Sequence, residues 1–487
     1  RSSNGGQSWE QRGALGGFQG CEPGTQNWYN AGLTVDPNNR DTLILSAWWT
    51  YRSTDGAQTF SNLLCTGNQA SVHIDQHARA FVGGDSNRLL IGNDGGVYYS
   101  ANATAAAPTF IPLNDTLPTI EFYYGDISAN FADASTRVIV GGAQDNGTSV
   151  YAPGNSLSAG TWTHVNGGDG ITARIEPVFG QRLYYSSQYG SINVSLNGPN
   201  APDQGASGPW SPGNTGGDRK SFLMPFDLYK YGDTNVPGSG CDAVNGCNRL
   251  IAGTYRVWES LNGAIGPNQA SRWTAISPDL TKGTLVVGSD NRSVIQSIRY
   301  AVSDARVAIV GTLDGNVAYG FGLGSGAPAT WRDVSDGNRV LPNRPILGVA
   351  TDPQNPLIGY AAVAGFSANT PATPGHVFQV RCNADCSSVS WRNVSGNLPD
   401  VSTAAVIVNP WLPRQVYVGT DWGLYFTDNI EADQPLWQRF EGLPRAMVWD
   451  LAIDRGFSTL AIYTRSRGAY VWPLPRAASQ PNLTGLW

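Results

Sequence analysis

A unit of about 50 residues recurs along the chain. Each copy has an apolar strand that often ends in Asp-Pro, an apolar strand that ends in Gly, and an aromatic strand that ends in Ser. Apolar alternation in stretches such as "RVIVGG" and "RQVYVGT" indicates short β-strands. A polar loop and a large aromatic residue then close the copy. The closing aromatic residues are Phe60, Phe110, Trp162, Trp210, Trp273, Trp331, Trp391 and Trp437.

Four strands in about 50 residues match the size of a propeller blade. Eight complete units end at the closing aromatic residues, and residues 448–475 supply the inner strands of another unit. Residues 1–12 are typical of an outer strand that begins in the middle of a repeat, as in a mature product whose leader has been removed. We therefore expect an all-β fold, with residues 1–487 forming one closed propeller domain of about nine four-stranded blades (range about eight to ten). The strand at 1–12 would complete the last blade, which would remove exposed sheet edges.

Charge and hydropathy argue against two classes of partner. The net charge is −6, and the three lysines (Lys220, Lys230 and Lys282) form no basic run. A nucleic-acid footprint is therefore not expected. No apolar segment reaches about 18 residues, so no membrane span is expected either. A single closed ring is expected to be a monomer.

Six cysteines suggest a disulfide framework. Cys241 and Cys247 are close in sequence, as are Cys382 and Cys386, which leaves Cys21 and Cys65 as a third pair. Free thiols and a metal site are the alternatives, but zinc sites usually cluster Cys with nearby His. Disulfides would place the protein in an oxidising compartment, secreted or periplasmic.

Two hairpin sequences carry a family resemblance. "SSNGGQSW" (Ser2–Trp9) and "STDGAQTF" (Ser53–Phe60) resemble the Asp-box, or bacterial neuraminidase repeat, Ser-x-Asp-x-Gly-x-Thr-Trp. Asn4 replaces Asp in the first copy, and Ala57 replaces Gly in the second. The resemblance implies that the box is the turn between the third and fourth strands of a blade. Its Asp would cap the turn and its aromatic residue would pack between blades.

A longer resemblance covers Gln26 to about Gly190. The order "HIDQHARAF", "GNDGGVYYS", "GGAQDNGT" is similar to that of secreted bacterial Asp-box proteins with sortilin-like propellers, commonly labelled sialidase- or xyloglucanase-like hydrolases. The resemblance implies the fold and secretion. A sialidase would need a Phe/Tyr-Arg-Ile-Pro strand early in the chain, which "ARIEP" matches poorly. A tandem-propeller xyloglucanase would need a cleft between two rings, which a single ring lacks.

Histidine is rare in this chain, yet three of its four histidines lie beside Asp and Gly. Strand alternation predicts that His73, Asp75 and His77 lie on one side of an innermost strand. Asp94 and Asp145 fall in turns between second and third strands, and Asp169 falls at the start of an innermost strand. These positions would share one propeller mouth. The candidate catalytic residues are therefore Asp75, Asp94, Asp145, Asp169, His73 and His77.

Other readings of these residues remain open. The histidine cluster also fits a structural hydrogen-bond ladder or a metal site. Asp-Gly pairs are common in tight hairpin turns for conformational reasons alone, and this suffices for Asp314 and Asp421. Oxygen-rich turns suit Ca²⁺, although nothing in the sequence requires a cofactor.

The chemistry best suited to these residues acts on carbohydrate. Paired carboxylates can divide acid and base roles, and neighbouring histidines can keep one charged or act as the base. Aromatic side chains would stack on sugars, although packing between blades is the alternative. The substrate-binding candidates are Trp48, Trp49, Tyr98, Tyr124, His164, Arg256, Trp258 and Trp422.

We therefore expect a secreted glycoside hydrolase with paired carboxylates at the propeller mouth. The alternative is a non-catalytic, lectin-like or sortilin-like propeller that binds a glycan or peptide.

Overall fold

The structure, a computed structural model, describes residues 1–13, 24–64, 72–152, 162–198, 203–210, 217–266 and 272–476. The described chain is all-β apart from the short helix α1 (Asn27–Asn30) and a few 3₁₀ turns. It divides into two compact units, Arg1–Thr119 and Ile120–Trp487, where the sequence predicted one domain. Among the described helices, none has the length and apolar character needed to cross a membrane.

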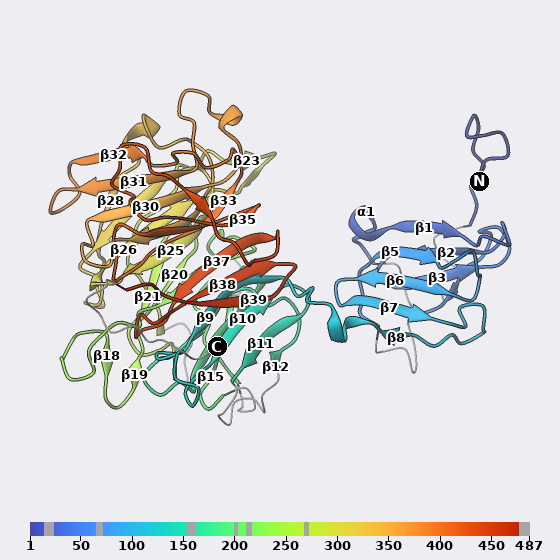
Figure 1. Ribbon diagram of the computed structural model, residues 1–487, viewed down its shortest axis with the longest axis horizontal. Coiled ribbons are helices and arrows are strands. Elements are labelled where there is room, and N and C mark those ends of the chain that lie inside the picture. The colour runs from blue at the N-terminus through green and yellow to red at the C-terminus, as the bar shows by residue number, and fades with distance from the viewer. Residues whose placement is uncertain are drawn as a thin grey trace. The chain divides into compact units, whose positions relative to one another are not determined.

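The first unit contains two four-stranded antiparallel sheets, each with its strands in chain order (Figure 1). The first sheet consists of β1 (Gly32–Val35), β2 (Leu43–Ser46), β3 (Thr50–Ser53) and β4 (Ser61–Asn62). The second consists of β5 (Gln76–Phe81), β6 (Leu89–Asn93), β7 (Gly96–Ser100) and β8 (Ile111–Pro112), followed by the 3₁₀ turn η1 (Asn114–Thr116). Ile44, Leu89 and Ile91 lie in the core of this unit.

Among its described residues, the second unit contains seven sheets of three or four strands and two two-stranded ribbons. The first three contain β9 (Phe122–Ile127), β10 (Ile139–Ala143), β11 (Gly147–Tyr151) and β12 (Trp162–Asn166); β13 (Ala173–Ile175), β14 (Leu183–Ser187), β15 (Ser191–Ser195) and β16 (Asp203–Gly205); and β17 (Phe226–Leu228), β20 (Leu250–Gly253), β21 (Val257–Ser260) and β22 (Thr274–Ala275).

The next three sheets contain β25 (Ile295–Ala301), β26 (Asp304–Thr312), β27 (Val317–Phe321) and β28 (Thr330–Asp333); β29 (Ile346–Thr351), β30 (Ile358–Val363), β31 (Val377–Cys382) and β32 (Val389–Asn393); and β33 (Thr403–Val408), β34 (Val416–Thr420), β35 (Gly423–Thr427) and β36 (Gln438–Arg439). The seventh contains β37 (Met447–Ile453), β38 (Thr459–Arg465) and β39 (Ala469–Pro473).

Short elements lie between the strands of these sheets. They are the ribbons β18 (Cys241–Asp242) with β19 (Gly246–Cys247) and β23 (Val286–Val287) with β24 (Asp290–Asn291), and the 3₁₀ turns η2 (Gln188–Gly190), η4 (Asp336–Asn338) and η5 (Ser367–Asn369).

The first strands of the seven sheets pack against one another in chain order. β9 contacts β13, the contacts continue through β17, β25, β29 and β33 to β37, and β37 contacts β9. All six residues of β9 are buried, as are five of the six in β33. Four-stranded antiparallel sheets arranged in this way are typical of a β-propeller. No individual sheet closes on itself within the described residues.

The last sheet differs from the prediction. Residues 448–475 coincide with β37, β38 and β39, and their sheet has three strands in the described chain. Residues 7–11 are not in a strand. The N-terminal segment instead forms a local turn in which the Glu10 N–H donates to the Arg1 carbonyl (2.8 Å). Closure by an N-terminal outer strand is therefore not observed in this part of the chain.

The closing tryptophans form a regular contact between neighbouring sheets. The indole N–H groups of Trp273, Trp331, Trp391 and Trp437 donate to the carbonyls of Ala206, Ile276, Val334 and Val394. Each carbonyl belongs to the residue that directly follows the outermost strand of the preceding sheet. A buried indole needs such an acceptor, so the repeated tryptophan fixes one sheet to the next.

Of the two Asp-box-like hairpins, the one at Ser53–Phe60 lies between the third and fourth strands of its sheet, as predicted, whereas no strand flanks the copy at Ser2–Trp9 within the described residues. Ser53 and Asp55 connect β3 to β4, and the Thr59 N–H donates to Asp55 Oδ1 (3.0 Å). Hydrogen bonds from the Thr59 hydroxyl, the Thr59 backbone N–H and the Ser53 hydroxyl lower the pKa of Asp55 to about 2. In the N-terminal copy, Asn4 accepts the Ser8 N–H (3.0 Å) in the same manner.

Two of the three predicted disulfides lie within the described residues. Cys241 bonds to Cys247, and Cys382 bonds to Cys386. The predicted pair of Cys21 and Cys65 lies outside the described residues. Two disulfides point to an oxidising environment.

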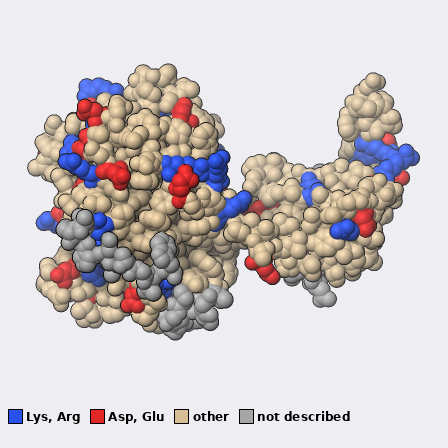
Figure 2. All heavy atoms as spheres, in the orientation of Figure 1, with Lys and Arg blue, Asp and Glu red and all other residues tan. Residues whose placement is uncertain are grey.

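Acidic and basic side chains are interspersed on the face drawn in Figure 2. This mixed distribution agrees with the absence of a basic run in the sequence.

Candidate functional site

Asp75 lies immediately before β5 rather than within it. Its backbone is left-handed, with a φ of 62°, a conformation that Asp tolerates better than most residues. The Asp75 N–H donates to the Trp48 carbonyl (3.0 Å), which fixes the backbone. The predicted alternation of His73, Asp75 and His77 along one strand is therefore wrong. β5 begins only at Gln76, and its pairing with β6 shifts register there.

The carboxyl group of Asp75 is buried, with the residue 7% exposed. Burial raises its pKa, and the nearby charge of Asp94 raises it further. Asn30 donates from Nδ2 to Asp75 Oδ1 (2.8 Å). This hydrogen bond and the charges of His73 and His77 oppose the rise without reversing it. Asp75 is therefore suited to carry a proton at a higher pH than an ordinary aspartate.

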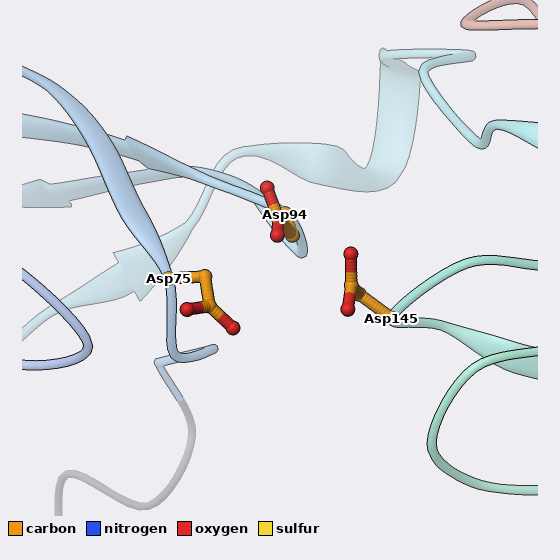
Figure 3. Close-up of side chains that lie close together, drawn as sticks. All are labelled: Asp75, Asp94 and Asp145. Atoms are coloured by element: carbon orange, nitrogen blue, oxygen red, sulfur yellow. The ribbon is translucent and has the colours of Figure 1, made fainter. Parts of the chain in front are cut away.

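Asp94 lies in the two-residue turn between β6 and β7, as predicted (Figure 3). One of its carboxylate oxygens lies within 4.8 Å of a carboxylate oxygen of Asp75. The His77 Nε2–H donates to Asp94 Oδ1 at 2.7 Å. The first unit therefore brings together a buried carboxyl group and a second carboxylate held by an imidazole.

The second unit holds the other two predicted aspartates. Asp145 lies in the turn between β10 and β11, as predicted, with a φ of 60° (Figure 3). Its backbone N–H donates to Oδ1 of Asp169, which precedes β13 (3.1 Å). Asp145 and Asp169 therefore share one end of these two sheets.

The remaining predicted histidines have different surroundings. His73 is half-buried, and its Nδ1 lies 3.0 Å from the Ile74 carbonyl oxygen. His164 lies exposed on β12, the fourth strand of its sheet. The His77 ring, in the first unit, contacts the Asp94 carboxylate.

The predicted substrate-binding residues divide between exposed and packed positions. Trp48 and Trp49 lie in the turn between β2 and β3, where Trp48 donates to Gln26 Oε1 (2.9 Å). Trp422 lies in the turn between β34 and β35 and is 59% exposed. Three others are buried by packing, namely Tyr98, Tyr124 and Trp258.

Arg256 is engaged in a local ion pair. Its guanidinium group contacts both carboxylate oxygens of Asp218 (2.9 and 2.8 Å), and the Trp258 indole donates to the same carboxylate (2.9 Å). This network stabilises the turn between β20 and β21. It also explains why Trp258 packs in the core rather than facing a ligand.

The sequence reasoning missed the residues of α1. Asn30, which is 2% exposed, supplies the hydrogen bond to Asp75, while Trp28 and Tyr29 lie at the surface. The signal in the sequence was "NWYN", where two adjacent aromatic residues cannot both be buried on one face of an alternating strand. The Asn was not recognised because its partner lies 45 positions away.

The carboxylates of Asp75 and Asp94 are oxygen ligands of the kind that Ca²⁺ takes. Calcium proteins usually provide six or more oxygens, so two side chains would supply only part of such a shell. Calcium binding therefore stays a prediction.

Comparison with known proteins identifies no relative by sequence. No family model matches the chain, and no curated protein matches it. A solved structure titled "Crystal Structure of Mitotic Checkpoint Complex" is similar to this chain, with a TM-score of 0.46 and 12% sequence identity. That match covers 76% of this chain and 96% of the other.

Proposed function

We propose that the protein is a secreted glycoside hydrolase whose reacting carboxyl groups are Asp75 and Asp94. The observation that carries this proposal is the buried Asp75, with its raised pKa, beside a second carboxylate. A protonated carboxyl group can donate to the glycosidic oxygen, while an ionised one acts at the anomeric carbon. Two similar side chains thereby receive different roles from their surroundings.

Their separation favours one of the two stereochemical courses. Carboxyl groups about 5–5.5 Å apart are typical of retaining enzymes, whereas about 6.5–9.5 Å leaves room for an attacking water. Carboxylate oxygens within 4.8 Å of each other support the role of nucleophile for Asp94. Asp75 would protonate the leaving oxygen as the bond from Asp94 to the anomeric carbon forms. It would then accept a proton from the water that releases the sugar.

The neighbouring residues support these roles. The hydrogen bond from His77 orients the Asp94 carboxylate, and the one from Asn30 orients Asp75. Because both partners come from the same unit, the arrangement belongs to Arg1–Thr119.

Replacing either carboxyl group tests the proposal. Asp75→Asn and Asp94→Asn should each lower the release of reducing ends from neutral polysaccharides by roughly 100-fold or more, the range of general acid–base effects. Asp115→Asn, an exposed aspartate in the same unit, is the control. Equal turnover by all four proteins would refute the proposal. Binding without any product would support the non-catalytic alternative instead.

We further propose that the seven sheets of the second unit form one closed ring, joined by the packing of β37 on β9. Two hydrogen bonds support this closure. Asp450 of β37 accepts the Gly125 N–H of β9 (3.2 Å), and the Tyr463 hydroxyl of β38 donates to the Asp126 carbonyl of β9 (2.8 Å). Such closure would bury the inner strands of the first and last sheets without exchanging a strand.

A further inference from the structure

Helix α1 presents its residues in opposite directions. Asn30 is 2% exposed and contacts Asp75, whereas Trp28 is 84% exposed and Tyr29 is 60% exposed. Other aromatic residues of this unit, such as Tyr51 and Tyr98, are buried. A single exposed aromatic residue needs no explanation. Two adjacent ones on the segment that positions a buried carboxyl group are informative.

A continuous series of contacts links these rings to Asp94. The centroids of Trp28 and Tyr29 are 5.7 Å apart, and Tyr29 meets the His77 ring edge-on at 5.0 Å. His77 in turn donates to Asp94 (2.7 Å). Edge-to-face packing of this kind favours a defined ring orientation. Tyr29 is therefore held at a defined position relative to Asp94, with Trp28 beside it.

The chemistry of this surface selects the ligand. The apolar C–H face of a pyranose ring can cover an indole or phenol ring and remove it from water, while the sugar hydroxyls remain available to polar groups. The ionised carboxylate of Asp94 would repel the carboxylate of a sialic or uronic acid. A neutral sugar meets no such repulsion.

We propose that Trp28 and Tyr29 form a stacking subsite for one pyranose ring of a neutral glycan, adjacent to the pair Asp75 and Asp94. This inference rests on the proposed function in that it takes the substrate to be a glycan. The subsite would hold the chain while the neighbouring glycosidic bond meets the carboxyl groups.

The subsite can be tested by binding, separately from catalysis. Full-length protein carrying Asp75→Asn is run through native gels containing hydroxyethylcellulose, xyloglucan or galactomannan, which are neutral, or polygalacturonate, which is anionic. Poly-lysine, titrated in solution, probes the alternative that the site takes a basic peptide. The additional variants are Trp28→Ala, Trp28→Phe and Tyr29→Ala. Trp9→Ala is the matched control, because Trp9 is 75% exposed in the same unit.

We expect at least one neutral polysaccharide to retard the parent protein. Trp28→Ala should weaken that binding roughly tenfold, a change of about 1.4 kcal/mol. Tyr29→Ala should weaken it as well, Trp28→Phe should retain most of it, and Trp9→Ala should leave it unchanged.

Three results would overturn the subsite. These are no binding to any neutral polysaccharide, a preference for polygalacturonate or poly-lysine, or equal binding by the parent and Trp28→Ala. The outcome of the hydrolysis assay does not depend on the outcome of this binding assay. If Trp28→Ala loses binding but the wild type forms no product, only the proposed reaction is wrong. If product forms and Trp28→Ala binds normally, only the subsite is wrong.

Discussion

Asp450 offers a direct test of how the second unit holds its first and last sheets together. It lies on β37, accepts the Gly125 N–H of β9 (3.2 Å), and contacts the Arg299 guanidinium of β25 (2.9 Å). Its side chain is 4% exposed, whereas that of Arg299 is 25% exposed. Asp450→Ala would therefore leave one backbone donor and one cation without their carboxylate partner.

The expected loss can be estimated from this geometry. Removing one partner of a buried ion pair costs about 3–5 kcal/mol because the other charge stays buried. Water reaches a quarter of the Arg299 side chain, and burial raises the pKa of Asp450, so its ionised form is already penalised. Both facts favour the lower end, about 3 kcal/mol.

Thermal unfolding followed by circular dichroism provides the assay. The second unit spans about 370 residues, and an unfolding entropy of about 2.1 cal/mol/K per residue then gives roughly 0.8 kcal/mol/K. A loss of about 3 kcal/mol should lower its midpoint by about 4 °C. The double variant Asp450→Leu with Arg299→Met should recover most of this, because replacing a whole pair by apolar groups is often close to neutral.

Either of two results would refute this reasoning. An unchanged midpoint for Asp450→Ala would mean that the carboxylate does not link these strands. A double variant as unstable as the single one would mean that the loss does not come from the uncompensated charge of Arg299.

Three further predictions follow from individual groups. Since burial and Asp94 raise the pKa of Asp75 above its unfolded value, the acid form of Asp75 persists to higher pH. The value of kcat/KM should therefore fall as pH rises through that pKa, and an increase there would contradict the role of Asp75 as the acid. The pKa of Asp55 is lowered to about 2, so its contribution to stability is present above the unfolded value of about 3.9 and is lost as pH falls toward 2; an NMR titration with a midpoint near 4 would disprove this. Trp437→Phe removes the indole donor to the Val394 carbonyl (2.9 Å) and should cost about 1–3 kcal/mol in urea unfolding, whereas an unaltered midpoint would show that the contact between sheets is dispensable.

Local sequence rules predicted the positions of individual turns well. Asp94 and Asp145 lie between second and third strands, and the positive φ values at these turns fall on Gly96 in the first and on Asp145 and Gly147 in the second, residue types that accept them. The closing tryptophans were recognisable from their regular spacing, and four of them make the same contact with the preceding sheet. Both features depend on a few neighbouring residues in the repeat.

The grouping of sheets could not be obtained in the same way. β9 is buried along its whole length, whereas residues of β1 alternate between half-buried and exposed positions. This difference in burial depends on what packs against each strand. The sequence repeat itself looks alike in both units and carries no information about that packing. The prediction of one continuous domain was therefore based on a signal that does not encode which sheets pack together.

The candidate site was predictable only in part. Asp75 and Asp94 were selected from their motifs, but the left-handed backbone of Asp75 depends on a hydrogen bond to the distant Trp48 carbonyl. Tyr98 and Trp258 were proposed as sugar contacts and proved to be buried, because aromatic residues serve packing as readily as binding.

The most direct test of the central claim is the configuration of the first product. A neutral polysaccharide that the protein cleaves is incubated with wild type, and ¹H NMR follows the anomeric signal before mutarotation. The pair Asp75 and Asp94, with oxygens within 4.8 Å, predicts net retention, with the signal absent in Asp75→Asn. Initial inversion, or an undiminished signal from Asp75→Asn, would contradict the account.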